Sequence, residues 1–463
     1  ACVRLFVFLN SRKLFINPPF CIFYFFVNAV VFQLLKLIYV FFQEKSLFIV
    51  TLFLCSYEYL KTLGFVGFSY GVSAYTQWKN IYFIQLANIT GVFGLNLLLV
   101  FPSVWLADFV INHKKRNIRL YVTGGIWCVL LIFDYIYGVV SIKSNRNIYE
   151  TVKVAAIQNN EDPWKNGLEE YSKNIQKLKY LTEEAFEFHP DIEYVVWPET
   201  SVVPSIMYHF YKLVDQNRFR VIYSLLNYMD SKDCVFVIGN SHEEENKKRN
   251  TDRYNSAMVF NAGINVMPPE PGIYSKIHLV PFTEYFPYKY YFPNLYVKLL
   301  NGDTHMWEKG KEYTVFSEGK LKFSTPICFE DTFGNECRYF VKNGARCFFN
   351  MSNDAWSKSL SCQMQHLSMA VFRSVENGVP TVRSSTSGQT CIIDSNGRIK
   401  NMVPAFCESY VVENIPVYGD EFRLTLYTRF GDVAGRLEVV GTFLLLLIQI
   451  FNVIIKKNSK TVK

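Results

Sequence analysis

Charge is scarce in this sequence, and scarcest near its start. Charged residues make up 19% of the 463 residues, below the roughly 25% of an average soluble domain. Between Phe20 and Asn112 only seven of 93 residues are charged. A composition that is half apolar and 17% aromatic excludes a disordered chain, a collagen-like chain and a coiled coil. Much of the net charge of +8 falls in two short clusters, so it does not indicate nucleic-acid binding.

Motifs for common cofactors are absent as well. The sequence has no GxSxG, P-loop, HExxH or dinucleotide-binding fingerprint, so no metal or nucleotide cofactor is implied. Its 11 cysteines are an odd number without CxxC or regular spacing, which argues against a zinc site or a disulfide framework. Seven of them fall in the part expected below to lie outside the cytoplasm, where disulfides can form. Buried free thiols are the alternative. These seven are Cys234, Cys328, Cys337, Cys347, Cys362, Cys391 and Cys407.

Five long apolar stretches predict membrane-spanning helices, because each approaches or exceeds the about 20 residues that cross a bilayer core. They are Phe20–Phe42, Leu47–Val72, Ile81–Ile111, Leu120–Ile142 and the uncharged Val439–Ile455. We therefore expect a transmembrane helical domain over 1–145, with about four spans, and a C-terminal transmembrane helix over 437–456. Since the chain starts with Ala1 rather than Met, we also expect its N-terminus to be truncated.

Two basic clusters predict the orientation in the membrane. His113–Arg119 and the tail Lys456–Lys463 each contain four Lys or Arg and no acidic residue. Both are expected to be cytoplasmic by the positive-inside rule. The segment 143–436 is then outside the cytoplasm, and 457–463 forms a cytoplasmic tail.

The outer segment predicts an α/β domain over 150–425, because short flat apolar runs alternate with polar, helical patterns. We expect helices at Leu168–Glu187 and Ser361–Asn377, and we take the charge run Ser241–Asn250 to be a solvated loop. The expected strands are Val152–Gln158, Tyr194–Trp197, Cys234–Asn240, Ser256–Asn261, Leu321–Cys328, Arg346–Met351, Thr381–Ser385 and Cys391–Asp394.

Reactive side chains stand at the ends of three apolar runs. Glu199 ends one, Lys276 and Glu284 share a second segment, and Cys328 and Glu330 share a third. We expect them to converge, because ligands bind beyond the carboxyl ends of buried strands. A nearby Lys lowers the pKa of a thiol, and a Glu can take and return its proton. The set supports acyl transfer through a thioester. A buried structural thiol and an ordinary ion pair are the alternatives.

Resemblance to a known family favours the first interpretation. "VVWPETSVV", "YSKIHLVPFTEYFP" and "STPICFEDTF" resemble the catalytic blocks of the nitrilase (carbon–nitrogen hydrolase) superfamily, and most of all its membrane-bound apolipoprotein N-acyltransferases. "IQNNEDPWKNG", "FFNMSNDAW" and "QHLSMAVFRSVENGVPTVRSSTSG" are similar to further family segments. The resemblance implies an αββα sandwich outside the multi-span membrane domain. It also implies Glu199 as general base, Lys276 as oxyanion and positioning residue, and Cys328 as the acyl-carrying nucleophile.

Supporting residues are implied in the same way. Glu284 resembles the second active-site glutamate of the family, and Phe329 and Glu330 occupy positions implicated in function. Phe329 stands where an aromatic residue with a hydroxyl group is usual, and Ser357 replaces a usual aromatic residue. Trp164 is a candidate for lining the substrate site, with a packed loop tryptophan as an equal alternative.

Other features leave alternatives open. His366 and Arg373 lie seven residues apart on one face of the expected helix, and we expect them to be structural anchors. The aromatic run Glu284–Leu300 is either a loop that dips into the bilayer and guides an acyl chain or a core strand and turn.

The implied protein is an N-acyltransferase of the bacterial inner membrane, with its catalytic domain on the periplasmic side. By a ping-pong reaction it takes an acyl chain from a membrane phospholipid and passes it to the α-amino group of the N-terminal diacylglyceryl-cysteine of an apolipoprotein. One rival is a membrane-tethered amidase or nitrilase-type hydrolase that acts on a small substrate. A transporter or scaffold with an inactive nitrilase domain is the other.

Overall fold

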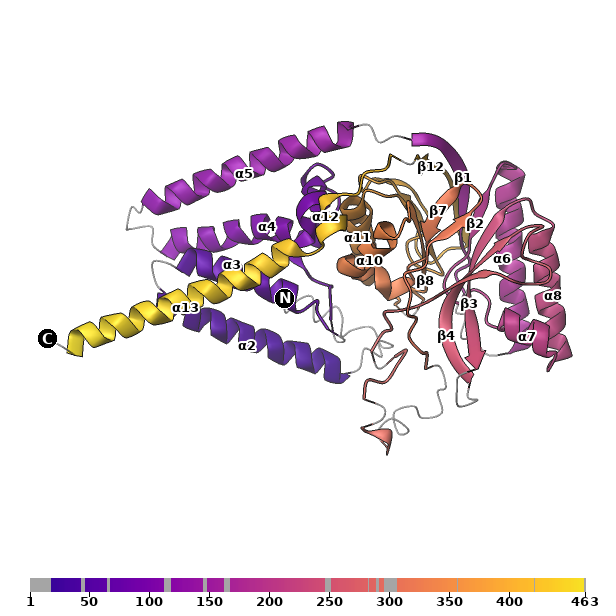
Figure 1. Ribbon diagram of the computed structural model, residues 1–463, viewed down its shortest axis with the longest axis horizontal. Helices are drawn as coiled ribbons and strands as arrows, with labels where there is room; N and C mark the ends of the chain where they lie inside the picture. Colours follow the sequence, from indigo (N-terminus) through magenta and orange to yellow (C-terminus); the bar gives the residue numbers. More distant parts are fainter. Residues whose placement is uncertain are drawn as a thin grey trace. The chain divides into compact units, whose positions relative to one another are not determined.

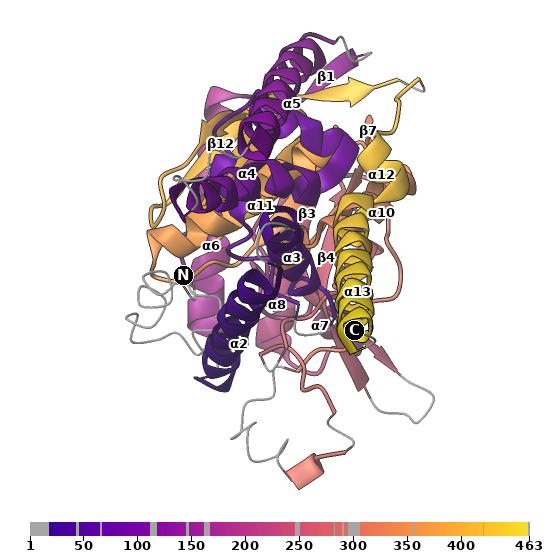
Figure 2. The same cartoon turned by 90° about the vertical axis from the view of Figure 1, so that its left-hand side faces the viewer.

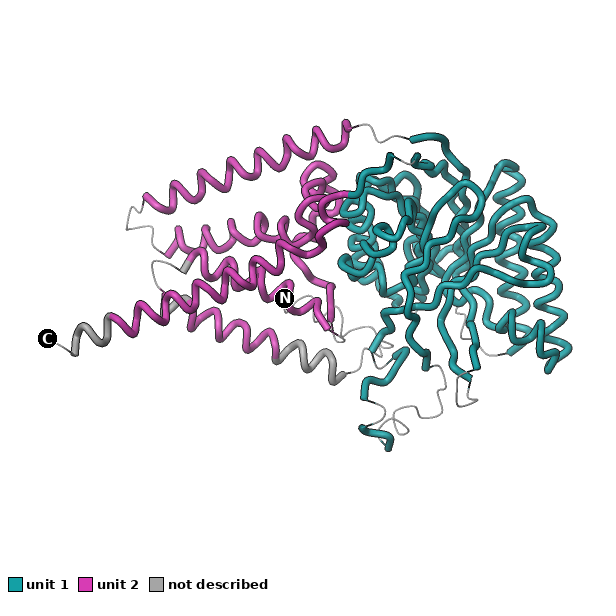
Figure 3. Tube along the Cα trace, viewed as in Figure 1, with its two compact units in different colours: residues 1–13, 145–424 teal, residues 14–144, 425–463 magenta. Residues whose placement is uncertain are grey.

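The computed structural model describes residues 18–42, 46–64, 67–111, 118–144, 148–161, 167–245, 251–281, 283–288, 291–294, 306–355, 357–419 and 421–461. The chain divides into two compact units (Figure 3). One, the α/β unit, consists mainly of residues 145–424. The other, the helical unit, combines residues 14–144 with 425–463. The helical unit is therefore discontinuous in sequence, and the α/β unit is inserted between its two parts.

Apolar helices make up the helical unit. Three segments are long and apolar enough to cross a membrane, namely Phe83–Ile111, Ile118–Lys143 and Val433–Ile455, and shorter apolar helices cover Val27–Ile38 and Leu47–Leu60. In the described residues, three of the five expected spans thus meet the length and composition needed to cross a bilayer. The elements are α2 (Pro18–Phe42), α3 (Ser46–Leu60), η2 (Ser73–Gln77), η3 (Phe83–Leu86), α4 (Ala87–Ile111), α5 (Ile118–Lys143), α12 (Leu426–Phe430) and α13 (Val433–Thr461).

The second apolar stretch differs from the expectation. We expected one helix over Leu47–Val72, but α3 ends at Leu60. The chain then turns at Gly64 and Gly71, whose φ angles of 77° and 78° are readily adopted only by glycine. The residues around these turns are apolar, so hydropathy alone does not detect where the helix ends.

Helices that are distant in sequence pack together in this unit. α13 lies along α3 (Figure 2), and the hydroxyl oxygens of Ser56 and Thr442 are 2.8 Å apart. Gly435 permits a close approach, because a Cβ atom at this position would lie 2.5 Å from the ring of Tyr59. Small residues and interhelical hydrogen bonds are the usual means of joining helices in a membrane.

Two six-stranded sheets form the α/β unit. The first has the order β12-β1-β2-β3-β4-β5, with β1, β2 and β3 parallel. The second has the order β11-β10-β9-β8-β7-β6, with β7, β8 and β9 parallel. The strands are β1 (Ile148–Gln158), β2 (Tyr194–Val196), β3 (Val235–Glu245), β4 (Thr251–Asn261), β5 (Gly272–Ser275), β6 (Phe316–Glu318), β7 (Leu321–Ser324), β8 (Cys347–Ser352), β9 (Thr381–Ser385), β10 (Cys391–Ile393), β11 (Ile399–Met402) and β12 (Ser409–Tyr418).

Helices cover the outer faces of both sheets (Figure 1). α6 (Leu168–Phe188), α7 (Ile206–Lys212) and α8 (Gln216–Asp230) lie on the first sheet, and α10 (Gly334–Lys342) and α11 (Leu360–Asn377) lie on the second. Along β1 the side chains alternate between two cores. Val152 and Val154 pack toward the second sheet, whereas Ala155 and Ile157 pack with α6 and α8. This is the expected αββα sandwich, and the predicted fold class is confirmed.

The secondary structure of the α/β unit agrees with the sequence in its most apolar parts. Each of the eight expected strands overlaps an observed one, and both expected helices are present. The pattern missed β5, β6, β11, β12, α7, α8 and α10. The loop expected at Ser241–Asn250 was wrong over its first half, because β3 continues to Glu245 and pairs His242 with Tyr254. Residues 246–250 lie outside the described residues.

Candidate active site

Lys276 lies between two carboxylates. It follows β5, and its buried Nζ is 3.2 Å from Oε1 of Glu199 and 2.7 Å from Oε1 of Glu284. Burial alone lowers the pKa of Lys276, but Glu199, Glu284 and Cys328 together raise it well above its usual value. The side chain is therefore an ammonium group that partly neutralises two glutamates.

Glu199 is surrounded by hydrogen-bond donors. It follows β2, and its Oε1 accepts from Lys276 and, at 2.8 Å, from Nδ2 of Asn255 on β4. Its Oε2 accepts from the backbone N–H of Asn353 at 2.9 Å. Donors thus hold both oxygens of a carboxyl group, which is a group that can act as a general base.

Asn255 is a site residue that the sequence did not single out. Its Nδ2 also lies 3.3 Å from Oε1 of Glu284, so one amide spans both glutamates. The available signal was a polar residue just before the apolar run "SAMVF", which the structure places inside β4. Such a signal is weak, because the residue before an apolar run is often polar for other reasons.

Cys328 opens the 3₁₀ helix η4 (Cys328–Thr332) beyond the end of β7. Its φ angle of 49° lies in the left-handed region, which is costly for a residue with a Cβ. Desolvation raises the pKa of its thiol well above the usual 9.0, Glu199 raises it further, and Lys276 lowers it. The thiol is therefore neutral at physiological pH, and the charges of Glu199 and Lys276 both influence its pKa. A nucleophilic role for this thiol requires a base.

Glu330 joins the segment of Lys276 to the segment of Cys328. Its Oε1 accepts from the hydroxyl of Tyr274 at 2.7 Å and from the backbone N–H groups of Ile277 and His278 at 2.7 and 3.0 Å. Its Oε2 accepts from the N–H of Ile327 at 2.7 Å. Burial raises its pKa to about 7, against the four donors. The carboxyl group thus fixes the backbone next to Lys276 and next to Cys328.

The remaining candidate residues lie differently. The ring of Phe329 packs against His278 and Phe333, with centroids 5.7 and 5.0 Å apart. Ser357, which replaces a usual aromatic residue of the family, is buried. Trp164 lies outside the described residues, so the structure does not test its expected role.

The aromatic run after Glu284 is not a core strand over its described part. Tyr288, Tyr291 and Phe292 are exposed and Phe286 is buried, and the segment contains turns, residues 293–294 in helical conformation and one isolated bridge between Pro281 and Tyr285. Of the second alternative, the core strand is therefore wrong for the described residues and the turn is present, whereas the loop that dips into the bilayer stays a prediction.

The described residues of the α/β unit contain neither a disulfide nor a metal site. The seven cysteines within residues 145–424 are all free thiols. Among the residues that the structure describes, no group of three or more His, Cys, Asp or Glu side chains has the arrangement of a metal site.

Comparisons with known proteins find related sequences for parts of both units. The family model for carbon–nitrogen hydrolases matches residues 153–419, and the model for the apolipoprotein N-acyltransferase N-terminal domain matches residues 6–105. Apolipoprotein N-acyltransferase 1 of Treponema denticola is 40% identical over 98% of this chain and 86% of its own length. Apolipoprotein N-acyltransferase 1 of Treponema pallidum is 41% identical over 88% of this chain and 77% of its own. Among solved structures, Nit3 of Saccharomyces cerevisiae, a nitrilase superfamily member, has a TM-score of 0.42 at 17% identity and covers 59% of this chain and 93% of its own.

Proposed function

This chain belongs to the apolipoprotein N-acyltransferase family, and on that premise we propose that it transfers a fatty acyl chain from a membrane phospholipid to an apolipoprotein. The acceptor is the α-amino group of the N-terminal diacylglyceryl-cysteine. One observation supports the chemistry above all. The Lys276 ammonium group lies 3.2 Å from the Glu199 carboxylate, and both charges act on the pKa of the Cys328 thiol. Nucleophile, oxyanion partner and base are the groups that acyl transfer needs.

The first half-reaction loads the enzyme. Glu199 takes the proton of the Cys328 thiol, and Sγ attacks the ester carbonyl carbon of the phospholipid. The carbonyl oxygen becomes negative and faces the Lys276 ammonium group. The ester C–O bond then breaks, and Glu199 gives its proton to the departing oxygen of the lysophospholipid. Cys328 is left as an acyl thioester.

The second half-reaction discharges the thioester. The neutral α-amine of the lipoprotein attacks the thioester carbonyl carbon, and Glu199 accepts a proton from the nitrogen as the new C–N bond forms. The C–S bond breaks, and Glu199 returns the proton to the sulfur of Cys328. The products are an amide and the free thiol. Water competes with the amine, so the reaction needs a site that excludes it.

Supporting roles follow from the contacts. Glu284 holds the Lys276 ammonium group in place together with Glu199, and Glu330 fixes the backbone on both sides of the site. Phe329 and Trp164 are proposed substrate contacts. We assign catalysis to residues 150–425, on the periplasmic side of the inner membrane. The proposed anchors are the spans within 1–145 and the helix at 437–456, and 457–463 is the cytoplasmic tail. The exposed aromatic residues after Glu284 fit a loop that enters the lipid interface.

The rival functions have less support. A hydrolase of small amides would need only a tether. The described residues of the helical unit include three helices able to span a membrane, and its N-terminal part matches an acyltransferase model. An inactive domain is disfavoured because Glu199, Lys276 and Cys328 are all present.

Intact-mass measurement of the detergent-purified protein tests the proposal. After incubation with phospholipid, the wild type should gain the mass of a fatty acyl group, and Cys328→Ala should not. Hydroxylamine should remove the adduct, and a diacylglyceryl-cysteine peptide should discharge it to an amide.

Two outcomes would contradict this assignment. Hydrolysis of small amides without any acyl adduct would favour the tethered hydrolase. An adduct that also forms on Cys328→Ala would mean that another residue is the nucleophile.

A further inference from the structure

A buried charge cluster lies behind Cys328. His366 on α11 contacts Asp331 and Asp354, and Arg383 on β9 pairs with the same two aspartates. All four charged side chains are buried. Ion pairs interact strongly in a low-dielectric interior, so these groups hold one another in fixed positions. None of the four takes part in the steps proposed above.

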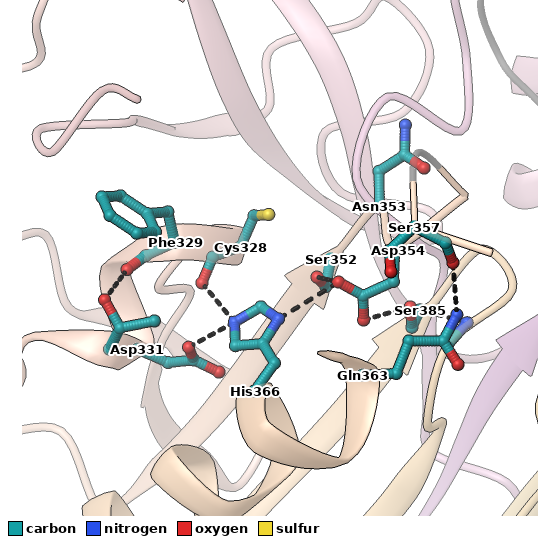
Figure 4. Close-up of polar contacts among 12 residues, drawn as sticks. Cys328, Phe329, Asp331, Ser352, Asn353, Asp354, Ser357, Gln363, His366 and Ser385 are labelled. Carbon is teal, nitrogen blue, oxygen red and sulfur yellow. Dashed lines mark hydrogen bonds and ion pairs between the residues drawn. The ribbon is translucent and has the colours of Figure 1, made fainter. Parts of the chain in front are cut away.

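His366 also reaches the main chain of the nucleophile. Its Nε2 is 2.7 Å from Oδ1 of Asp331 and 3.3 Å from the carbonyl oxygen of Cys328. Figure 4 shows this carbonyl oxygen facing the imidazole ring, whereas Sγ of Cys328 points away from it. Both oxygens are acceptors, so Nε2 carries a proton and donates. The charge cluster is thereby tied to the backbone of Cys328.

We propose that His366 is a positioning residue for the reaction of Cys328: its Nε2–H holds the Cys328 carbonyl and so maintains the left-handed turn that directs Sγ toward Lys276 and Glu199. A left-handed backbone is unfavourable for a residue with a Cβ, and Cys328 has a φ angle of 49°. A donor on a rigid cluster offsets this cost. The inference rests on the proposed function for the reaction that is served, but the contact itself needs no substrate.

The donor persists whether His366 is charged or neutral. Burial lowers the pKa of His366, Asp331 raises it, Arg383 lowers it and Asp354 raises it, with a result of about 9. If the ring loses a proton, Nδ1 can become the acceptor for Nη2 of Arg383, which lies 2.9 Å away. Nε2 then keeps its proton. Positioning by this contact should therefore not switch off at alkaline pH.

Two isosteric substitutions separate positioning from general stability. In His366→Gln the amide nitrogen reaches about as far as Nε2, so the donor to Cys328 is retained. In His366→Asn the shorter amide reaches only the place of Nδ1, and that donor is lost. Ser374→Ala is the matched control on the same helix, because its hydroxyl contacts Thr381 and not the site. Acyl-enzyme formation from phospholipid gives kcat and KM for each variant, and thermal midpoints report folding.

The expected result is a difference between the two variants at similar thermal midpoints. His366→Gln should form the acyl-enzyme within about tenfold of the wild-type kcat, and His366→Asn should lose about 100-fold in kcat at unchanged KM. Ser374→Ala should behave as wild type. Equal kcat values for the Gln and Asn variants would overturn the proposal. If the wild type itself forms no acyl-enzyme, the proposed function fails instead, so the two failures can be told apart.

A measurement on the unmodified protein covers the case in which His366→Asn does not fold. With ring-¹⁵N histidine, the Nε2 resonance of His366 is assigned by its loss in His366→Gln. It should remain that of a protonated nitrogen across the pKa of about 9. A neutral ring protonated on Nδ1 would overturn the proposal, because Nε2 could no longer donate to Cys328.

Discussion

Replacement of Glu199 by glutamine should slow the acylation of Cys328 and, at the same time, ease the ionisation of its thiol. The carboxylate accepts from Lys276 and Asn255 on one oxygen and from the N–H of Asn353 on the other. Glutamine has nearly the same shape but only one acceptor, so one donor must face its amino group. The variant therefore loses the proton acceptor and one negative charge.

The two losses act in opposite directions on two reactions. Without the base, acyl-enzyme formation should fall by about 10²–10⁴-fold, the usual contribution of a positioned proton acceptor. Without the charge, the pKa of the Cys328 thiol should fall, because Glu199 raises it more than any other nearby charge. Iodoacetamide needs only the thiolate, so its reaction with Cys328 should begin at a lower pH in Glu199→Gln than in the wild type.

Mass spectrometry can follow both reactions on the same samples. The intact mass reports acylation by phospholipid, and the mass of the Cys328 peptide reports alkylation at each pH. Glu193→Gln is the matched control, because Glu193 pairs with Lys320 on the surface rather than with the site. An alkylation profile displaced to higher pH, or acylation within about threefold of the control, would refute Glu199 as the base.

Three further predictions follow from the same contacts. Lys276→Met leaves two buried carboxylates without their shared cation, so it should abolish acylation, raise the pKa of the Cys328 thiol and cost about 3–5 kcal/mol of stability, measurable by alkylation and thermal unfolding. Glu330→Gln leaves a buried N–H without an acceptor and should cost about 1–3 kcal/mol, with kcat falling at constant KM in the acylation assay. His366 has a folded-state pKa of about 9, above its ordinary 6.5; it should therefore add about 3 kcal/mol of stability that is complete below pH 6.5 and is lost as the pH rises through 9, a pH dependence of the thermal midpoint that is missing in His366→Gln.

The strands that could be predicted from the sequence are those buried on both faces. Most residues in runs such as Val152–Gln158 are apolar, because each face of the strand packs on a core. β12 (Ser409–Tyr418) was not predicted, because Glu413, Asn414 and other partly exposed residues interrupt the apolar pattern. The ends of β3 and β4 were also missed. There the charged residues, such as Glu244 and Asp252, pair across the two strands and are partly or fully exposed, so their charge does not oppose a strand.

The site could be predicted as far as single reactive groups at strand ends. Strand order then brings Glu199 and Lys276 together, as contacts between them show. The groups that hold them could not be predicted, because they act through tertiary geometry. Asn255 spans two glutamates from a neighbouring strand, and the N–H of Asn353 belongs to the backbone. His366 was expected to be a structural anchor, and only the fold reveals its contact with Cys328.

The helical unit is formed by two separate segments of the chain, and this affects the order in which it can assemble during synthesis. Its α3 packs against α13, and Ser56 meets Thr442 across that contact. A ribosome makes α3 long before α13, with the whole α/β unit in between. The surface of α3 that packs on α13 therefore has no α13 to contact until the α/β unit has been synthesised. α13 closes this part of the helical unit, and a chain that stops before residue 433 would leave that surface open to lipid or to other proteins.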